Sequence, residues 1–103
     1  PVVHASSQQS AQLAMPILRK MDADPFWNRF IDQIAVDDQG LIQLHPRLGD
    51  LTIQLGNAAD LEDQLDIQLS HLKTFYGAMI ESGDLRQYSE LDLRYDGQLV
   101  ARK

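Results

Sequence analysis

The sequence predicts an α+β fold, in which a mostly antiparallel mixed sheet is covered on one face by helices. Between residues 33 and 56, three short segments alternate apolar and polar side chains, as strands do when only one face is buried. Residues 60–82 follow, with leucines recurring every three or four positions, which is the period of an amphipathic helix. Residues 91–101 alternate again and predict a C-terminal strand or strands that complete the sheet.

The N-terminal part of the chain predicts helices. Residues 1–10 are mostly polar, and we expect them to be flexible. Residues 11–21 carry apolar side chains at helical spacing, and Pro16 means that the helix either starts near this proline or runs through it with a kink. Asp24-Pro25 is a typical cap and first-turn pair, so a second short helix is predicted over residues 25–30. The aromatic residues Phe26, Trp27 and Phe30 anchor it.

Three strands are predicted next, around Ile34, Ile42 and Ile53. Residues 38–40, Asp-Gln-Gly, predict the turn between the first two strands. Pro46 either ends the second strand or marks a sheet edge. The three segments together form a meander with one apolar and one polar face.

The long helix of residues 60–82 is expected to begin at a capping Asp60, with Asp63 in a weak capping box, and to end at Gly83. It connects the meander to the last strand. Such a crossover is usually right-handed, which sets the last strand parallel to residues 51–55. An antiparallel return at the other side of the meander is the alternative.

The C-terminal segment has three interpretations at Asp96-Gly97. The strand runs straight on, so that Leu99 and Ala101 stay on one face with Leu91. Alternatively, this pair forms a two-residue turn and the strand folds back, or Gly97 makes a β-bulge.

The composition and charge of the chain exclude several kinds of function. The 103 residues (11.6 kDa) suffice for a single domain, residues 1–103, with one core. The formal net charge of −6 argues against nucleic-acid binding, which needs a basic patch. The absence of cysteine excludes disulfides and thiolate chemistry. No apolar run approaches the roughly 20 residues of a membrane helix, and the start at Pro-Val-Val without methionine predicts a fragment of a longer chain.

Catalytic and metal-binding patterns are missing from the sequence. His4, His45 and His71 fall on three different predicted elements and lack metal-ligand spacing. The carboxylates at residues 37–38 and 60–63 suit a turn and a helix start. The serines lack the context of a nucleophile elbow, and the glycines do not form a phosphate loop. The sequence therefore predicts no catalytic residue, no metal site and no cofactor.

Several motifs, in this order and spacing, resemble the C-terminal extracytoplasmic β domain of the bacterial cell-division family FtsQ, called DivIB in other bacteria, in its Bacteroides-type version. The resemblance covers the chain from about residue 10 onward. Its motifs are Asp24-Pro25-Phe26-Trp27, Ile34-Ala35-Val36, Leu44-His45-Pro46-Arg47-Leu48-Gly49-Asp50, Ile53-Gln54-Leu55-Gly56, the helix around Leu72, Phe75 and Tyr76, and Asp92-Leu93-Arg94-Tyr95.

The resemblance implies a non-enzymatic scaffold of the division machinery. It implies a chain anchored by one membrane helix outside this fragment, with this domain on the periplasmic side of the inner membrane. The implied partners are FtsB-like and FtsL-like division proteins, of which FtsB adds a strand to the C-terminal edge of the sheet. Small-molecule substrates and nucleic acids are not expected partners.

The positions that match the family's partner surface are Arg94, Tyr95, Gly97, Gln98, Leu99 and Val100. The family implies that the arginine pairs with an acidic residue of the partner and that the tyrosine contacts an aromatic one. Without the resemblance, Arg94 and Tyr95 suit an ordinary solvated strand equally well. Gly97-Gln98 replaces the Ser-Gly of other members, and the chain stops at Lys103 where some relatives continue to a tryptophan.

The alternatives are a small periplasmic hydrolase, or a ligand-binding accessory domain of an envelope protein. A deep polar pocket with convergent histidine and aspartate would favour the enzyme. A flat surface and a free terminal strand would favour the scaffold.

Overall fold

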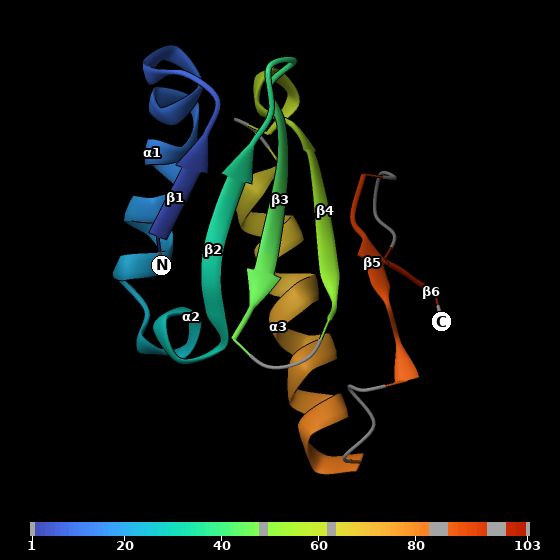
Figure 1. Cartoon of the computed structure of the whole chain (residues 1–103). Helices are drawn as coiled ribbons and strands as arrows, with labels where there is room; N and C mark the ends of the chain where they lie inside the picture. Colours follow the sequence, from blue (N-terminus) through green and yellow to red (C-terminus); the bar gives the residue numbers. More distant parts are fainter. Residues whose placement is uncertain (1, 48–49, 62–63, 83–86, 95–98, 103) are drawn as a thin grey trace.

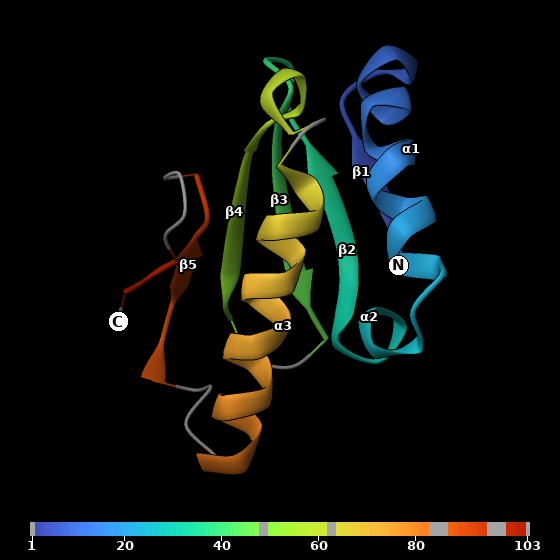
Figure 2. The same cartoon turned by 180° about the vertical axis from the view of Figure 1, so that it is seen from behind.

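The computed structural model describes residues 2–47, 50–61, 64–82, 87–94 and 99–102. Within these residues the strands form one mixed sheet in the order β1-β2-β3-β4-β5-β6, and the helices lie on one face of it (Figures 1 and 2). The predicted α+β fold class is confirmed. The elements are β1 (Val2–Ala5), α1 (Gln8–Asp22), α2 (Pro25–Phe30), β2 (Ile31–Val36), β3 (Leu41–Pro46), β4 (Thr52–Asn57), the 3₁₀ turn η1 (Ala58–Asp60), α3 (Leu65–Ser82), β5 (Glu90–Asp92) and β6 (Val100–Arg102).

The N-terminal residues differ from the flexible segment that their composition predicts. β1 pairs in parallel with β2, with Val3 opposite Ile34. The side chain of Ser7 then caps α1 by accepting a hydrogen bond from the Ser10 backbone N–H at 3.1 Å. α1 runs through Pro16, which is the second of the two predicted alternatives.

The meander forms as predicted, because β2–β3 and β3–β4 are antiparallel and bury alternate residues. In the turn before β3, the side chain of Asp37 accepts hydrogen bonds from the backbone N–H groups of Gln39 and Leu41. Gly40 has φ +82°, a left-handed conformation that favours glycine. α2 also matches its prediction, and Asp24 caps it through the Phe26 N–H.

The long helix begins later than predicted. α3 starts at Leu65, and Asn57 instead caps the short turn η1 by accepting from the Ala59 N–H at 2.9 Å. The prediction that Asp60 caps the long helix is therefore wrong, while Asp63 and Gly83 lie outside the described residues. The predicted crossover is confirmed, because β5 pairs in parallel with β4.

The core lies between the sheet and the helices. Leu72 is fully buried, and Leu65 and Leu69 are nearly so, as the helical spacing predicts. Tyr76 is almost fully buried, whereas its neighbour Phe75 is only partly buried. The strand residues of this cluster include Ile34, Ile42, Leu44, Ile53, Leu55 and Leu91, and Trp27 joins them from α2.

Candidate partner-binding edge

The strand β6 lies at one edge of the sheet. It pairs only with β5 in the described strand order, and β1 forms the opposite edge (Figure 1). Leu91 faces Ala101 across this pair, and Asp92 faces Val100. Because β5 and β6 are antiparallel, the chain folds back between Asp92 and Val100, and the straight continuation is ruled out.

The predicted partner residues are partly visible. Arg94 is exposed beside β5, and Leu99 and Val100 are partly buried at the start of β6. Tyr95, Gly97 and Gln98 lie outside the described residues, as does Asp96. The choice between a two-residue turn and a bulge at Asp96-Gly97 therefore stays open.

The segment that carries Arg94 is tied to the sheet and to α3. The Leu93 backbone N–H donates to the carbonyl of Gln54 in β4 at 2.9 Å. The Leu93 carbonyl accepts a hydrogen bond from Nε2 of Gln68 in α3 at 2.8 Å. Gln68 and Leu93 are both buried, so this bond fixes the backbone next to Arg94 from the helix side.

A buried carboxylate organises the charges at this edge. Asp92 is 0% exposed. Its Oδ1 accepts from the backbone N and from Nε of Arg94, at 3.0 and 2.9 Å. Its Oδ2 accepts from Arg94 at 2.7 Å and from Arg102 in β6 at 3.1 Å. Arg102 also pairs with Glu90, so one arginine ties β6 to two acids of β5.

These contacts set the ionisation of the cluster. The Arg94 guanidinium, helped by the Arg94 backbone N–H and by Arg102, holds the pKa of the Asp92 carboxyl far below its usual range, although burial acts in the opposite direction. The bond to Asp92, together with the charge of Glu90, raises the pKa of Arg102. Asp92 and Arg102 are therefore both charged at neutral pH.

Gly56 lies beneath the side chain of Arg94. The β3–β4 register shifts so that Ile42 faces Gly56 while Gln43 faces Gln54, which leaves Leu55 as the extra residue of a bulge. Gly56 has φ +111°. A Cβ atom at this position would lie 3.5 Å from Cγ of Arg94, so the arginine stem packs directly over the glycine.

The three histidines do not assemble a metal site in the described part of the chain. They lie on β1, β3 and α3, and no group of three or more metal-ligating side chains occurs among those residues. None of the helices there is long and apolar enough to cross a membrane. Among the carboxyl groups of the described residues, the pKa of Asp92 is lowered most, and its oxygens are occupied by the two arginines.

Comparison with known protein families gives a match to the family described as "FtsQ/DivIB, C-terminal related", over residues 1–102. The chain belongs to the FtsQ/DivIB C-terminal related family. No curated protein matches it. Because the match spans nearly the whole chain, the resemblance found in the sequence motifs is confirmed. Membership indicates a role in cell division and protein partners within the division complex.

Within this FtsQ/DivIB-related fold, sequence motifs pointed to Arg94 but missed the residues that hold it. Asp92 stands two positions before Arg94, so both side chains lie on the same face of an extended segment. Opposite charges at that spacing were a signal for the ion pair. The packing of Gly56 under Arg94 had no such signal, because the bulge that brings them together is a property of the β3–β4 pairing.

Proposed function

We propose that this chain is a non-enzymatic scaffold domain of the bacterial division machinery, which binds FtsB-like and FtsL-like partners by strand addition at β6. The observation that carries the proposal is the position of β6 as the last strand in the described sheet order. The backbone N–H and C=O groups on one side of an edge strand have no ladder partner, and an added strand satisfies them. The family match supports the choice of partner.

The two faces of β6 define what the partner strand must carry. On the helix side, Leu99 and Ala101 pack against the core but are only partly buried, so an added strand should place apolar side chains next to them. On the opposite face, Arg94 and Arg102 surround Asp92, and both arginine side chains are 43% exposed. Acidic or polar side chains of the partner suit this face. The partner strand should therefore alternate apolar and acidic or polar residues.

The same proposal places this domain outside the cytoplasm, on a chain anchored in the inner membrane by a helix that lies elsewhere in the protein. The support is membership of the FtsQ/DivIB-related family. Detection of the domain by protease added outside the inner membrane, in cells with a permeabilised outer envelope, tests this location.

Proline substitution tests the edge directly, because proline lacks the N–H that a ladder requires. Adjacent N–H groups of a strand point to opposite sides, so one member of the pair Val100→Pro and Ala101→Pro removes an N–H at the open edge. Its affinity for the FtsB–FtsL-type pair from the same genome should fall at least about tenfold, since main-chain bonds supply much of the affinity in strand addition. Its unfolding midpoint should stay nearly unchanged. The other variant should lose stability.

The opposite edge supplies a matched control. Val3→Pro and His4→Pro make the same change in β1, which is also an edge strand. Neither should weaken partner binding in a folded protein. The proposal is wrong if Val100→Pro and Ala101→Pro both fold and both bind the partner as tightly as the natural protein. It is also wrong if the β1 variants lose the partner instead.

A further inference from the structure

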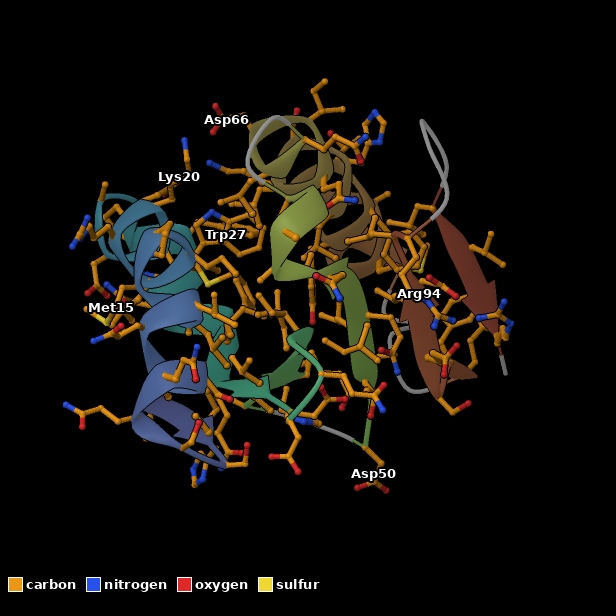
Figure 3. All side chains as sticks on the ribbon, turned by 90° about the horizontal axis from the view of Figure 1, so that it is seen from above. Met15, Lys20, Trp27, Asp50, Asp66 and Arg94 are labelled. Atoms are coloured by element: carbon orange, nitrogen blue, oxygen red, sulfur yellow. The ribbon has the colours of Figure 1, made fainter. Side chains whose placement is uncertain are left out.

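The carboxylate of Asp92 is buried on the face of the sheet that the helices do not cover. Asp92 pairs with Gln54 of β4 and Val100 of β6 and lies on the same face as both. Those two neighbours remain partly exposed, whereas Asp92 is 0% exposed. Asp92 is therefore covered by the side chains around it, which include those of Arg94 and Arg102 (Figure 3 labels Arg94).

The hydrogen bonds of Asp92 fix Arg94 more tightly than a surface ion pair would. Nε and a terminal nitrogen of Arg94 bind the two carboxylate oxygens side by side, at 2.9 and 2.7 Å. This forked arrangement sets both the position and the plane of the guanidinium. The Arg94 backbone N–H binds the same carboxylate, so backbone and side chain are held together. Packing of the arginine stem over Gly56 closes the remaining side.

A gain in folding stability alone does not explain why the charged carboxylate of Asp92 is buried here. Only the carboxylate is buried, since both arginine side chains are 43% exposed, and its desolvation offsets part of the attraction between the charges. The ion pair does restrict the conformations of the Arg94 side chain. An arginine side chain has many rotamers, and binding to a mobile arginine loses affinity because the side chain gives up conformational entropy. Arg94 is fixed before any partner arrives, yet its side chain is still 43% exposed.

From this geometry we infer that Asp92 is a positioning residue for the partner contact, and that it acts by fixing the guanidinium of Arg94, whose stem packs over Gly56. The inference rests on the proposed function, because it assigns Arg94 to the surface that binds the partner. It adds a residue that does not itself touch the partner.

The test measures the affinity of the full-length protein for the FtsB–FtsL-type pair from the same genome. Asp92→Asn keeps the size of the side chain and removes its charge, and affinity should fall about tenfold, as should that of Arg94→Ala. The double variant should bind no more than about twofold worse than Arg94→Ala, because Asp92 acts only through Arg94. If Asp92→Asn lowers affinity about tenfold again in the Arg94→Ala background, Asp92 acts on the strand itself and the inference is overturned.

Arg94→Lys gives a second test that leaves the buried carboxylate in place. Lysine keeps the charge but lacks the planar fork, so affinity should fall nearly as far as in Asp92→Asn. Equal binding by the lysine variant would overturn the inference. In ¹⁵N spectra, the Nε–H signal of Arg94 should exchange slowly with solvent in the natural protein and quickly in Asp92→Asn. An unchanged exchange rate would mean that Asp92 does not hold the guanidinium.

The outcomes separate this inference from the proposed function. If the β6 proline variants lose the partner while Asp92→Asn and Arg94→Lys bind normally, the edge is the partner site and only the role of Asp92 fails. If neither β6 proline variant weakens binding, the edge itself is wrong, whatever Asp92 does.

Discussion

Leu72 offers the sharpest test of how α3 and the sheet hold the domain together. It is 0% exposed in the middle of α3, in the same buried cluster as Ile42 and Ile53. Leu72→Ala removes three carbon atoms from a closely packed site and leaves a cavity. Comparable changes cost about 2–5 kcal/mol. Since small domains are stable by only about 5–15 kcal/mol, the variant should lose a large part of its stability.

Urea unfolding measures this loss, and the single tryptophan of the chain reports it. Trp27 is 3% exposed in the core (Figure 3), so its fluorescence should change when the core opens. The matched control is Ile67→Ala on the same helix, because Ile67 is 56% exposed. Its effect should stay within about 0.5 kcal/mol. In thermal unfolding, Leu72→Ala should lower the midpoint by at least about 8 °C, at roughly 4 °C or more per kcal/mol.

A loss of less than about 0.5 kcal/mol in Leu72→Ala, or a loss equal to that of Ile67→Ala, would refute the reasoning. Either result would mean that α3 does not pack this face against the sheet. The assignment of Leu65 and Leu69 to the core would fall with it, since they share the face.

Two further predictions concern the residues around Arg94, and a third concerns a histidine on α3. Gly56→Ala should cost about 1–3 kcal/mol in urea unfolding, because alanine is strained at φ +111°. The pKa of Asp92 is lowered on folding, so the unfolded chain takes up this proton first. The free energy of unfolding should therefore fall as the pH drops below the usual value of 3.8, and Asp92→Asn should reduce that fall in acid titrations of stability. His71→Ala, at an exposed position, should leave folding, partner affinity and division in cells unchanged. Loss of division with partner binding intact would favour an enzyme.

The middle of the fold could be predicted because its patterns are local. Strands that bury one face must alternate, and the segments around Ile34, Ile42 and Ile53 do so with turns between them. The handedness of crossovers then decided the direction of β5, which lies parallel to β4 as expected. Neither step needs knowledge of distant contacts.

Other parts of the fold depend on contacts between distant segments, which local sequence patterns do not indicate. β1 has only four residues, and its pairing with β2 joins segments separated by two helices. The start of α3 was misplaced because Asn57 caps η1, which displaces the long helix from Asp60. Acidic residues near a helix start are a general preference, and they did not identify the capping residue here.

The C-terminal edge of the sheet was predicted in outline but not in detail. Family motifs selected Arg94, and the alternation after Glu90 indicated strands. Three of the four hydrogen bonds on Asp92 come from Arg94, two positions away, and the fourth arises only when the chain folds back and brings Arg102 beside it. A local pattern gives the face on which a side chain lies, whereas the fold decides which side chains from other strands share that face.

The helices lie differently behind the two edges of the sheet. α1 lies directly behind β1, whereas α3 runs behind the middle strands and leaves the β5–β6 side at the margin of the helical layer (Figures 1 and 2). Leu99 and Ala101 consequently remain only partly buried. A strand added at β6 would bury them further and gain about 25 cal/mol for each Å² of apolar surface removed from water, in addition to its backbone bonds. The corresponding residues of β1 are covered no better, because Val3 is partly buried and Ala5 is exposed, so this gain alone does not separate the two edges. A partner strand at β6 would therefore extend the core as well as the sheet, and the proline variants of the two edges decide which of them binds the partner.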